Sequence, residues 1–210
     1  MTAFPKATEV QRRIPKEAFY RHLTLTQAQK DKFVSDVERI VIENSLTNDS
    51  LHFSTTAEIH EILVLSVFLK KQDFDGKIIE CIARQNPHKL LFQLVYEDRR
   101  QLALYHNRLY RTAWKKEDEI NVSLQGFSLD ELWNSFVEQI ALYEETAENT
   151  DSLTLNERLA LQSEIEKYEK LIQKTEKAVY KEQQPKKKFT LYTQLREYKK
   201  KLENLKNGKT

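Results

Sequence analysis

The sequence is poor in cysteine, glycine and proline: its 210 residues include one Cys, three Gly and four Pro. A single cysteine excludes an internal disulfide framework. Together with the lack of an apolar signal segment after Met1, it favours the reducing cytoplasm. So little glycine and proline argues against long flexible linkers. Cys81 stands beside Ile79 and Ile82, so we expect its thiol to be buried and inert.

Long hydrophobic runs are also missing. The longest run, from Ile62 to Leu69, is interrupted by Ser66. It is much shorter than the ~20 apolar residues that a membrane-spanning helix needs, so we expect no membrane segment. Hydrophobic residues still make up 40% of the chain. That share is enough to build the core of one domain of ordinary size with an extension.

Patterns typical of catalytic, metal or nucleotide sites are absent as well. There is no CxxC or HExxH pattern, and no two of His52, His60, His88 and His106 stand four residues apart. No glycine-rich loop is available to hold phosphate. Ser66 lacks the glycine-flanked elbow that presents a nucleophilic serine. We therefore expect no metal, no cofactor and no catalytic residue.

The net charge of +2 hides an uneven distribution. Residues 151–210 contain 15 Lys and Arg against 9 Asp and Glu, a net charge of +6, which leaves −4 for residues 1–150. After Pro185 the bias is stronger, with nine basic residues against Glu197 and Glu203. A basic tail on an acidic body suits contact with nucleic acid or with an acidic protein surface.

Hydrophobic periodicity predicts an α+β fold for residues 1–147, with a mixed β-sheet packed by helices. Thr26 with Gln29 forms a capping-box pattern, Asp73 stands where it could cap a second helix, and Ser128 precedes a third. The segment 4–14 has no clear period, so we expect an extended arm. The segment 59–69 is predicted to be a central strand buried on both faces, followed by a crossover helix and a parallel strand at 90–96. We also expect a short helix over 16–22 and strands over 38–46, 101–105, 108–114 and 120–124.

Residues 148–210 carry the strongest pattern, a narrow apolar stripe at alternating steps of four and three. Such a stripe is the seam of a coiled coil and must be covered by protein. It predicts an antiparallel hairpin of two helices, over about 153–182 and 186–207. The alternatives are one helix kinked at Pro185, or tails of two copies pairing in a homo-oligomer. The seam residues are Leu161, Ile165, Tyr168, Ile172, Thr175 and Val179, then Leu191, Leu195, Tyr198, Leu202 and Leu205.

Clustered basic residues on the second tail helix are the first candidate binding site. Lys and Arg clusters bind nucleic-acid phosphates, and the interleaved Phe189, Tyr192 and Tyr198 could stack on bases, although Tyr198 also belongs to the seam. The same cluster is consistent with a merely solvated face or with an acidic protein partner. The candidate residues are Lys186, Lys187, Lys188, Arg196, Lys199, Lys200 and Lys201.

A second candidate follows the strand at 59–69. A restriction-type nuclease holds Mg²⁺ with carboxylates and a Lys at the ends of adjacent strands. No Glu-x-Lys pattern lies in the strands at 59–69 and 90–96, and the closest set is Glu61, Lys70, Lys71, Asp73 and Asp75. The other interpretation makes the lysines a solvated strand end and Asp73 a helix cap. A divergent or degenerate nuclease is therefore kept as the alternative function.

Several stretches together resemble a known family over nearly the whole chain. They are PKATEV at 5–10, IPK at 14–16, LKKQDFD at 69–75, LFQLVY at 91–96, LALYH at 102–106 and QPKKKF at 184–189. In order and spacing they are similar to the bacterial domain-of-unknown-function family numbered four-three-nine-one. The resemblance implies genes encoded beside helicases, type III-like DNA methyltransferases and restriction subunits, and hence bacterial genome defence. It brings no catalytic residues with it. We expect a non-catalytic accessory subunit that docks on a helicase or methyltransferase and contacts DNA through its tail.

Overall fold

The computed structural model describes residues 4–15, 17–18, 23–54, 58–142, 147, 150 and 152–207. It divides into two compact units, Met1–Tyr143 and Glu144–Thr210, which we call the body and the hairpin unit. The division lies four residues before the boundary placed from the sequence at 147/148. Most of the short helix expected over 16–22 falls outside the described residues.

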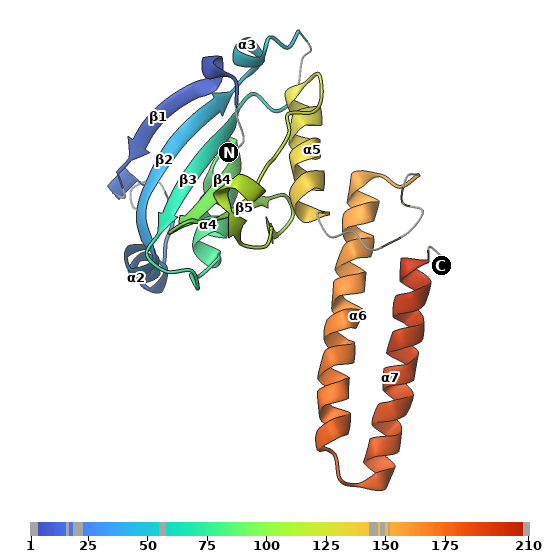
Figure 1. The fold of residues 1–210 in the computed structure, drawn as a ribbon. Helices are drawn as coiled ribbons and strands as arrows, with labels where there is room; N and C mark the ends of the chain where they lie inside the picture. Colours follow the sequence, from blue (N-terminus) through green and yellow to red (C-terminus); the bar gives the residue numbers. More distant parts are fainter. Residues whose placement is uncertain are drawn as a thin grey trace. The chain divides into compact units, whose positions relative to one another are not determined.

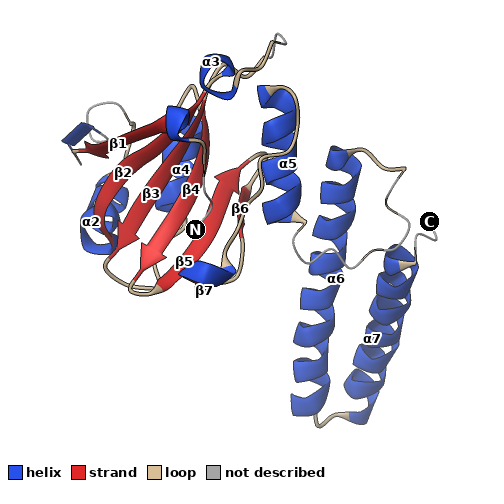
Figure 2. Cartoon of the chain, turned by 45° about the horizontal axis from the view of Figure 1, so that its top comes forward, coloured by secondary structure: helices blue, strands red, loops and turns tan. Residues whose placement is uncertain are grey.

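A seven-stranded mixed sheet forms the centre of the body (Figures 1 and 2). Six strands stand in chain order across it, and the seventh pairs with the fifth. The third and fourth strands are parallel, and the other pairs are antiparallel. This confirms the α+β class and the parallel crossover. The strands are β1 (Glu9–Ile14), β2 (Val37–Leu46), β3 (Ile62–Leu69), β4 (Lys89–Tyr96), β5 (Arg99–Tyr105), β6 (Leu109–Arg111) and β7 (Lys115–Lys116).

One face of the sheet is covered by α2 (Gln27–Asp36) and α4 (Lys77–Gln85). Alternate residues of the central strands point to that face, because successive side chains of a strand lie on opposite sides. They pack with Phe33 of α2 and with Ile79 and Ile82 of α4. In β3 both sets of alternating residues are mostly buried, as expected for a central strand. The strand residues of this core are Val37, Ile40, Ile42, Leu65, Val67, Leu69, Leu90, Phe92, Leu94 and Ala103.

Several helices of the body begin at residues whose side chains cap the first turn. α3 (Asn48–Leu51) begins with a capping box between Thr47 and Ser50. The capping box expected at Thr26 is present at the start of α2. α5 (Leu129–Ala141) packs against β5 and β6, and the Ser128 hydroxyl accepts a hydrogen bond from the Glu131 amide at 3.2 Å. A 3₁₀ turn, η2 (Glu117–Glu119), follows β7.

The first residues that the structure describes are more regularly folded than the arm expected from the sequence. They form a 3₁₀ turn, η1 (Lys6–Thr8), and then β1, which pairs antiparallel with β2. The pairing is irregular between Glu9 and Arg12, where Gln11 has a left-handed φ of 49°. The side chains of β1 are nearly all exposed, so this edge strand carries no hydrophobic alternation that could reveal it.

Two expected strands are shortened or missing. β6 covers only three residues of 108–114. The prediction of a strand over 120–124 was wrong, because no strand forms there. Ile120 and Val122 are nevertheless buried, which explains why apolar residues alternate in this segment. The neighbouring backbone bonds to a side chain instead of a strand: Ser123 N donates to Gln139 Oε1 at 2.8 Å, and Gln139 Nε2 donates to Ser123 O at 3.0 Å.

Two expectations about α4 were also wrong. The helix begins at Lys77 with Gly76 as its N-cap, so Asp73 lies too early to cap it and is exposed. Cys81 is partly exposed rather than buried, because only the neighbouring isoleucines face the core. Its Sγ accepts a hydrogen bond from Gln85 Nε2 at 2.9 Å.

The hairpin unit consists of α6 (Leu155–Lys181) and α7 (Pro185–Lys206), which pack antiparallel along their length (Figure 1). Thr154 and Glu157 form a capping box at the start of α6. The backbone N–H and the hydroxyl of Thr154 lower the pKa of the Glu157 carboxyl by bonding its charged form. Pro185 is the first residue of α7, a position that needs no backbone N–H. The antiparallel hairpin is therefore confirmed, and the single kinked helix is excluded.

Candidate functional site

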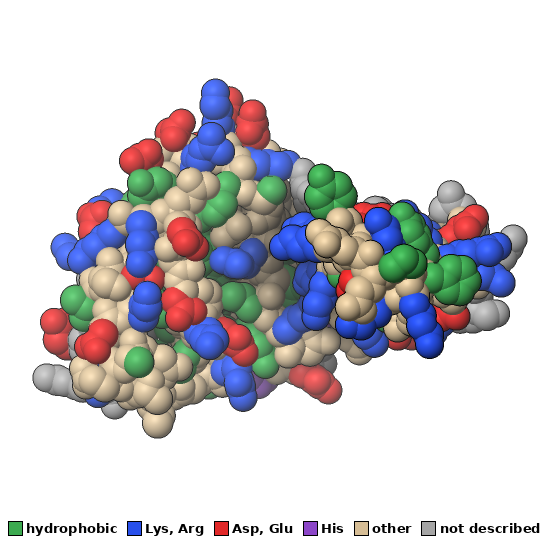
Figure 3. Space-filling model, turned by 90° about the horizontal axis from the view of Figure 1, so that it is seen from below, with side chains coloured by type: hydrophobic (Ala, Val, Ile, Leu, Met, Phe, Trp, Pro, Cys, Tyr) green, Lys and Arg blue, Asp and Glu red, His purple; other side chains and the backbone are tan. Residues whose placement is uncertain are grey.

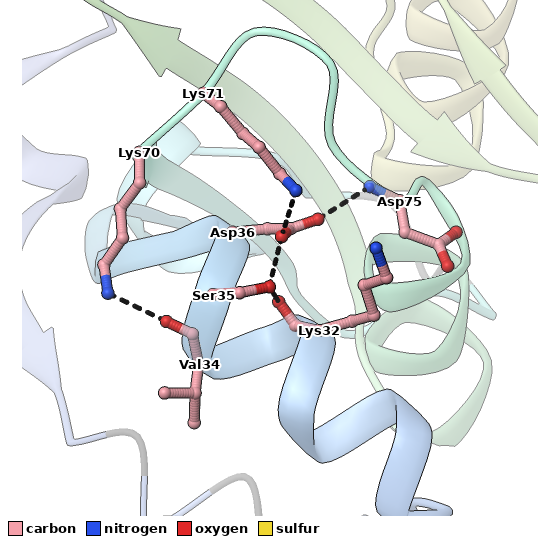
Figure 4. Close-up of polar contacts among 7 residues, drawn as sticks. All are labelled: Lys32, Val34, Ser35, Asp36, Lys70, Lys71 and Asp75. Atoms are coloured by element: carbon pink, nitrogen blue, oxygen red, sulfur yellow. Dashed lines mark hydrogen bonds and ion pairs between the residues drawn. The ribbon is translucent and has the colours of Figure 1, made fainter.

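The Lys70–Asp75 turn is tied to the end of α2 by the Asp36 carboxylate (Figure 4). Lys71 Nζ lies 2.8 Å from Asp36 Oδ1, and the Asp75 amide donates to Asp36 Oδ2 at 3.0 Å. The Ser35 hydroxyl donates to the same carboxylate. The Asp36 side chain is 0% exposed, whereas that of Lys71 is 44% exposed.

The pKa of Asp36 lies below its ordinary value as the result of opposing effects. Burial raises the pKa, because it disfavours the charged carboxylate. Hydrogen bonds from Lys71, Ser35 and the Asp75 amide, together with the charge of Lys71, lower it by more. Asp36 is therefore held as a charged carboxylate, and the charge of Lys71 balances it locally.

The other residues of this turn make structural contacts of their own. Lys70 Nζ donates to Val34 O at 2.8 Å, and the Lys77 amide donates to the Asp75 carboxylate at 3.0 Å. In Figure 4 the Asp75 carboxylate points away from that of Asp36. Lys70, Lys71 and Asp75 thus join α2, the end of β3 and the start of α4, while Asp73 is exposed.

The seam residues of the hairpin lie between its two helices, with unequal burial. Ile165, Ile172 and Leu195 are buried at 0%, 9% and 9% exposure. The rings of Tyr168 and Tyr198 lie 6.1 Å apart across the helices. Thr175 and Val179 are also buried, whereas Leu161, Leu191, Leu202 and Leu205 are half-buried at the border of the two-helix contact.

Two ion pairs cross from α7 to α6 along the same contact. Lys199 Nζ lies 2.8 Å from Glu176 Oε1, and Lys206 Nζ lies 2.9 Å from Glu169 Oε1. Lys201 Nζ lies 5.9 Å from the centre of the Tyr168 ring. Lys199 and Lys201 therefore already have partners within the hairpin. Of the other basic candidates, Lys188 is half-buried and the rest are exposed: Lys186, Lys187, Arg196 and Lys200.

Basic charge is concentrated in the half of the hairpin that contains the turn. Residues 170–200 contain ten Lys and Arg against three Asp and Glu, a net charge of +7, whereas residues 151–169 and 201–210 together carry −1. The turn half also exposes three aromatic side chains, Tyr180 at 90%, Phe189 at 73% and Tyr192 at 53%. Figure 3 shows hydrophobic side chains lying among Lys and Arg side chains over the hairpin. This half offers both phosphate-binding and stacking groups to a ligand.

The face of the sheet away from α2 and α4 contains a hollow of about 560 Å³. Its lining includes Ser66 and Gln93, and also Arg100 and Glu117, which form an ion pair of 2.8 Å. The charges around it are mixed and already paired in part. Sequence reasoning did not predict this hollow, because its lining comes from six separate segments of the chain.

Comparison with known protein families gives a match for this chain. Residues 3–202 match the family described as a domain of unknown function (DUF4391). The chain belongs to the DUF4391 family. No curated protein and no solved structure gave a significant match.

The DUF4391 match covers both units of the chain, from before η1 to Leu202 in the last turns of α7. The candidate basic residues, the exposed aromatic residues and every seam residue except Leu205 thus lie within the family's domain. In the parts of the chain that the structure describes, no three His, Cys, Asp or Glu side chains are grouped so as to hold a metal ion. None of the described helices combines the length and apolar character needed to cross a membrane.

Tyr180 is the residue of this DUF4391 hairpin that sequence reasoning missed. It follows the seam residue Val179 directly and therefore lies off the stripe, in the last turn of α6. An aromatic residue outside a coiled-coil seam has no partner helix to cover it. That position was the available signal, and the 90% exposure of Tyr180 shows its result.

Proposed function

We propose that this DUF4391 protein is a non-catalytic interaction subunit of a restriction–modification-like bacterial defence system. Its body docks on a helicase or DNA methyltransferase, and its hairpin contacts DNA. The observation that carries the second half is the net charge of +7 on residues 170–200, on a helical hairpin whose lysines largely face solvent. The first half rests on the gene neighbourhood that the family resemblance implies.

Contacts around the Lys70–Asp75 turn support a non-catalytic role for the alternative site. Lys71 is held by the buried Asp36, and Lys70 by a backbone carbonyl. A lysine that activates water must be free to approach the reacting group, and these two are committed to joining structural elements. The hairpin, in contrast, leaves Lys186, Lys187, Arg196 and Lys200 exposed.

Removing three exposed charges from the hairpin is expected to weaken DNA binding. The variant is Lys186→Gln, Lys187→Gln and Lys200→Gln together. Each phosphate that is no longer neutralised lowers the slope of log K against log salt by about 0.9, so three such phosphates should reduce the affinity about 10-fold or more at 0.1 M salt. Fluorescence anisotropy with a labelled 20-bp duplex at several salt concentrations measures both the affinity and the slope.

A matched control removes three exposed charges from the body: Arg12→Gln, Arg13→Gln and Lys77→Gln. Both variants change the net charge by the same amount. If the two variants weaken binding equally, binding follows net charge alone and the hairpin is not the DNA site.

Co-purification tests the docking half of the proposal. The full chain and a chain ending after Asp151 are each expressed with the neighbouring helicase or methyltransferase. If the body docks, both chains recover the partner, and only the full chain retains DNA. Failure of both chains to recover either partner would contradict the docking role.

A further inference from the structure

Four residues of α7 form one outward-facing row on the hairpin, and we call them the outer row: Phe189, Tyr192, Arg196 and Lys200. Their spacing of three, four and four places them on one side of the helix. At about 100° per residue this side is turned well away from the seam of Leu191, Leu195 and Leu202. Phe189 and Tyr192 are 73% and 53% exposed, and Arg196 and Lys200 are exposed.

The aromatic residues of the outer row contribute little to the stability of the hairpin. The apolar contact of α7 with α6 is made by the seam, where Leu195 is buried at 9% exposure and Tyr198 meets Tyr168. Phe189 and Tyr192 keep most of their surface in water instead. The two exposed rings therefore offer an apolar surface that the contact with α6 does not use.

Rings and cations follow one another along the row. The rings of Phe189 and Tyr192 are one helical turn apart, and Arg196 and Lys200 continue the same face over a total of about 16 Å. A ring can stack on a base, while a Lys or Arg next to it holds the phosphate that follows. Bases in a duplex are already stacked on each other, so only an unpaired strand can present its bases to an exposed ring on a convex helix.

From this arrangement we infer that the outer row binds single-stranded nucleic acid, with bases stacked on Phe189 and Tyr192 and phosphates held by Arg196 and Lys200. The inference deepens the DNA contact of the proposed function and rests on it. Charge favours this ligand over a second copy of the chain, because two hairpin ends of +7 each repel one another. Tyr180, exposed in the last turn of α6, adds a third ring to the turn half of the hairpin.

The test uses the full chain and three labelled probes: a 20-nucleotide single-stranded DNA, the RNA of the same sequence, and the 20-bp duplex. Binding is measured by fluorescence anisotropy. The variant is Phe189→Leu with Tyr192→Leu, which keeps the side chains apolar and removes the faces on which bases stack. We expect its affinity to fall at least about 20-fold for the single strands and less than about 2-fold for the duplex. The DNA and RNA arms show whether the sugar matters.

Two controls accompany the leucine variant. Phe127→Leu changes an aromatic side chain of the body that is 83% exposed, and it should leave all three affinities unchanged. Circular dichroism checks that the hairpin of the Phe189/Tyr192 variant stays helical, and light scattering checks its mass.

The outcomes separate this inference from the proposed function. If the leucine variant binds single strands as well as the original chain does, the outer row does not stack bases. The inference then falls, while weaker duplex binding by the Lys186/Lys187/Lys200 variant would still support the DNA contact. If no probe binds at all, both fall. If the leucine substitutions instead dissociate a dimer, the row is an interface between copies and the inference is overturned.

Discussion

Replacing Asp36 with alanine is expected to lower the free energy of unfolding of the body by roughly 3 kcal/mol. The carboxylate is 0% exposed and accepts from Lys71, Ser35 and the Asp75 amide. Its removal leaves the partly buried Asp75 amide without its acceptor and breaks the join between α2 and the β3–α4 turn. The cost stays below that of a fully buried ion pair, because the half-exposed Lys71 can return to water.

Urea unfolding followed by tryptophan fluorescence measures this change in the body alone, because both tryptophans, Trp114 and Trp133, lie there. The matched control is Asp73→Ala, in the same turn but exposed, for which we expect a change within about 0.5 kcal/mol. Equal effects of the two substitutions would show that the contacts of Asp36 do not stabilise the fold.

The difference in stability between the original chain and Asp36→Ala is expected to depend on pH. The pKa of Asp36 is lowered by folding, so its contribution is complete above the unfolded value of about 3.9 and disappears as the pH falls through the folded value. Below about pH 4, the stability of the original chain should therefore approach that of Asp36→Ala. A gap that stays constant down to about pH 2 would contradict the assignment.

Replacing Ile172 with aspartate is expected to unfold much of the hairpin. Ile172 is buried on the seam, between Glu169 and Glu176, whose carboxylates pair with lysines of α7. A charge placed there loses several kcal/mol of hydration or forces the helices apart. Separated helices of this kind are only marginally stable in water.

Circular dichroism at 222 nm measures the unfolding, because α6 and α7 contain 27 and 22 residues while α2, α4 and α5 together contain fewer. The control is Gln173→Asp, one position along the helix and exposed. We expect the control to keep its helix signal and both variants to keep the tryptophan signal of the body. A full helix signal in Ile172→Asp would mean that the helices are stable without the seam.

The spacing of hydrophobic residues was sufficient to predict the helices and strands that have one or both faces buried. The strands at β3 and β4 and the two tail helices follow directly from apolar spacing, and the caps at Thr26 and Ser128 follow from side chains that reach the first turn. β1 was not predictable in this way, because it pairs through its backbone while its side chains stay in water. The alternation of Ile120 and Val122 led to the opposite error, the prediction of a strand that does not form, because both residues are buried although neither lies in a strand.

The two candidate sites also differ in how much of each could be predicted from the sequence. The basic residues and two of the three exposed rings of the hairpin were visible in the sequence, because they are close together on one helix. The role of Lys71 was not, because its partner Asp36 lies on another element and is joined to it only by the fold. Such long-range polar pairs leave no local pattern.

The irregular edge at β1 bears on how copies of this protein meet. β1 ends the sheet on one side, and its outer backbone groups form a ladder that a strand from another molecule could extend. The left-handed Gln11 bends that ladder, and the exposed Arg12 and Arg13 would face the same arginines on an approaching copy. Pairing of a second copy along this edge is thereby disfavoured.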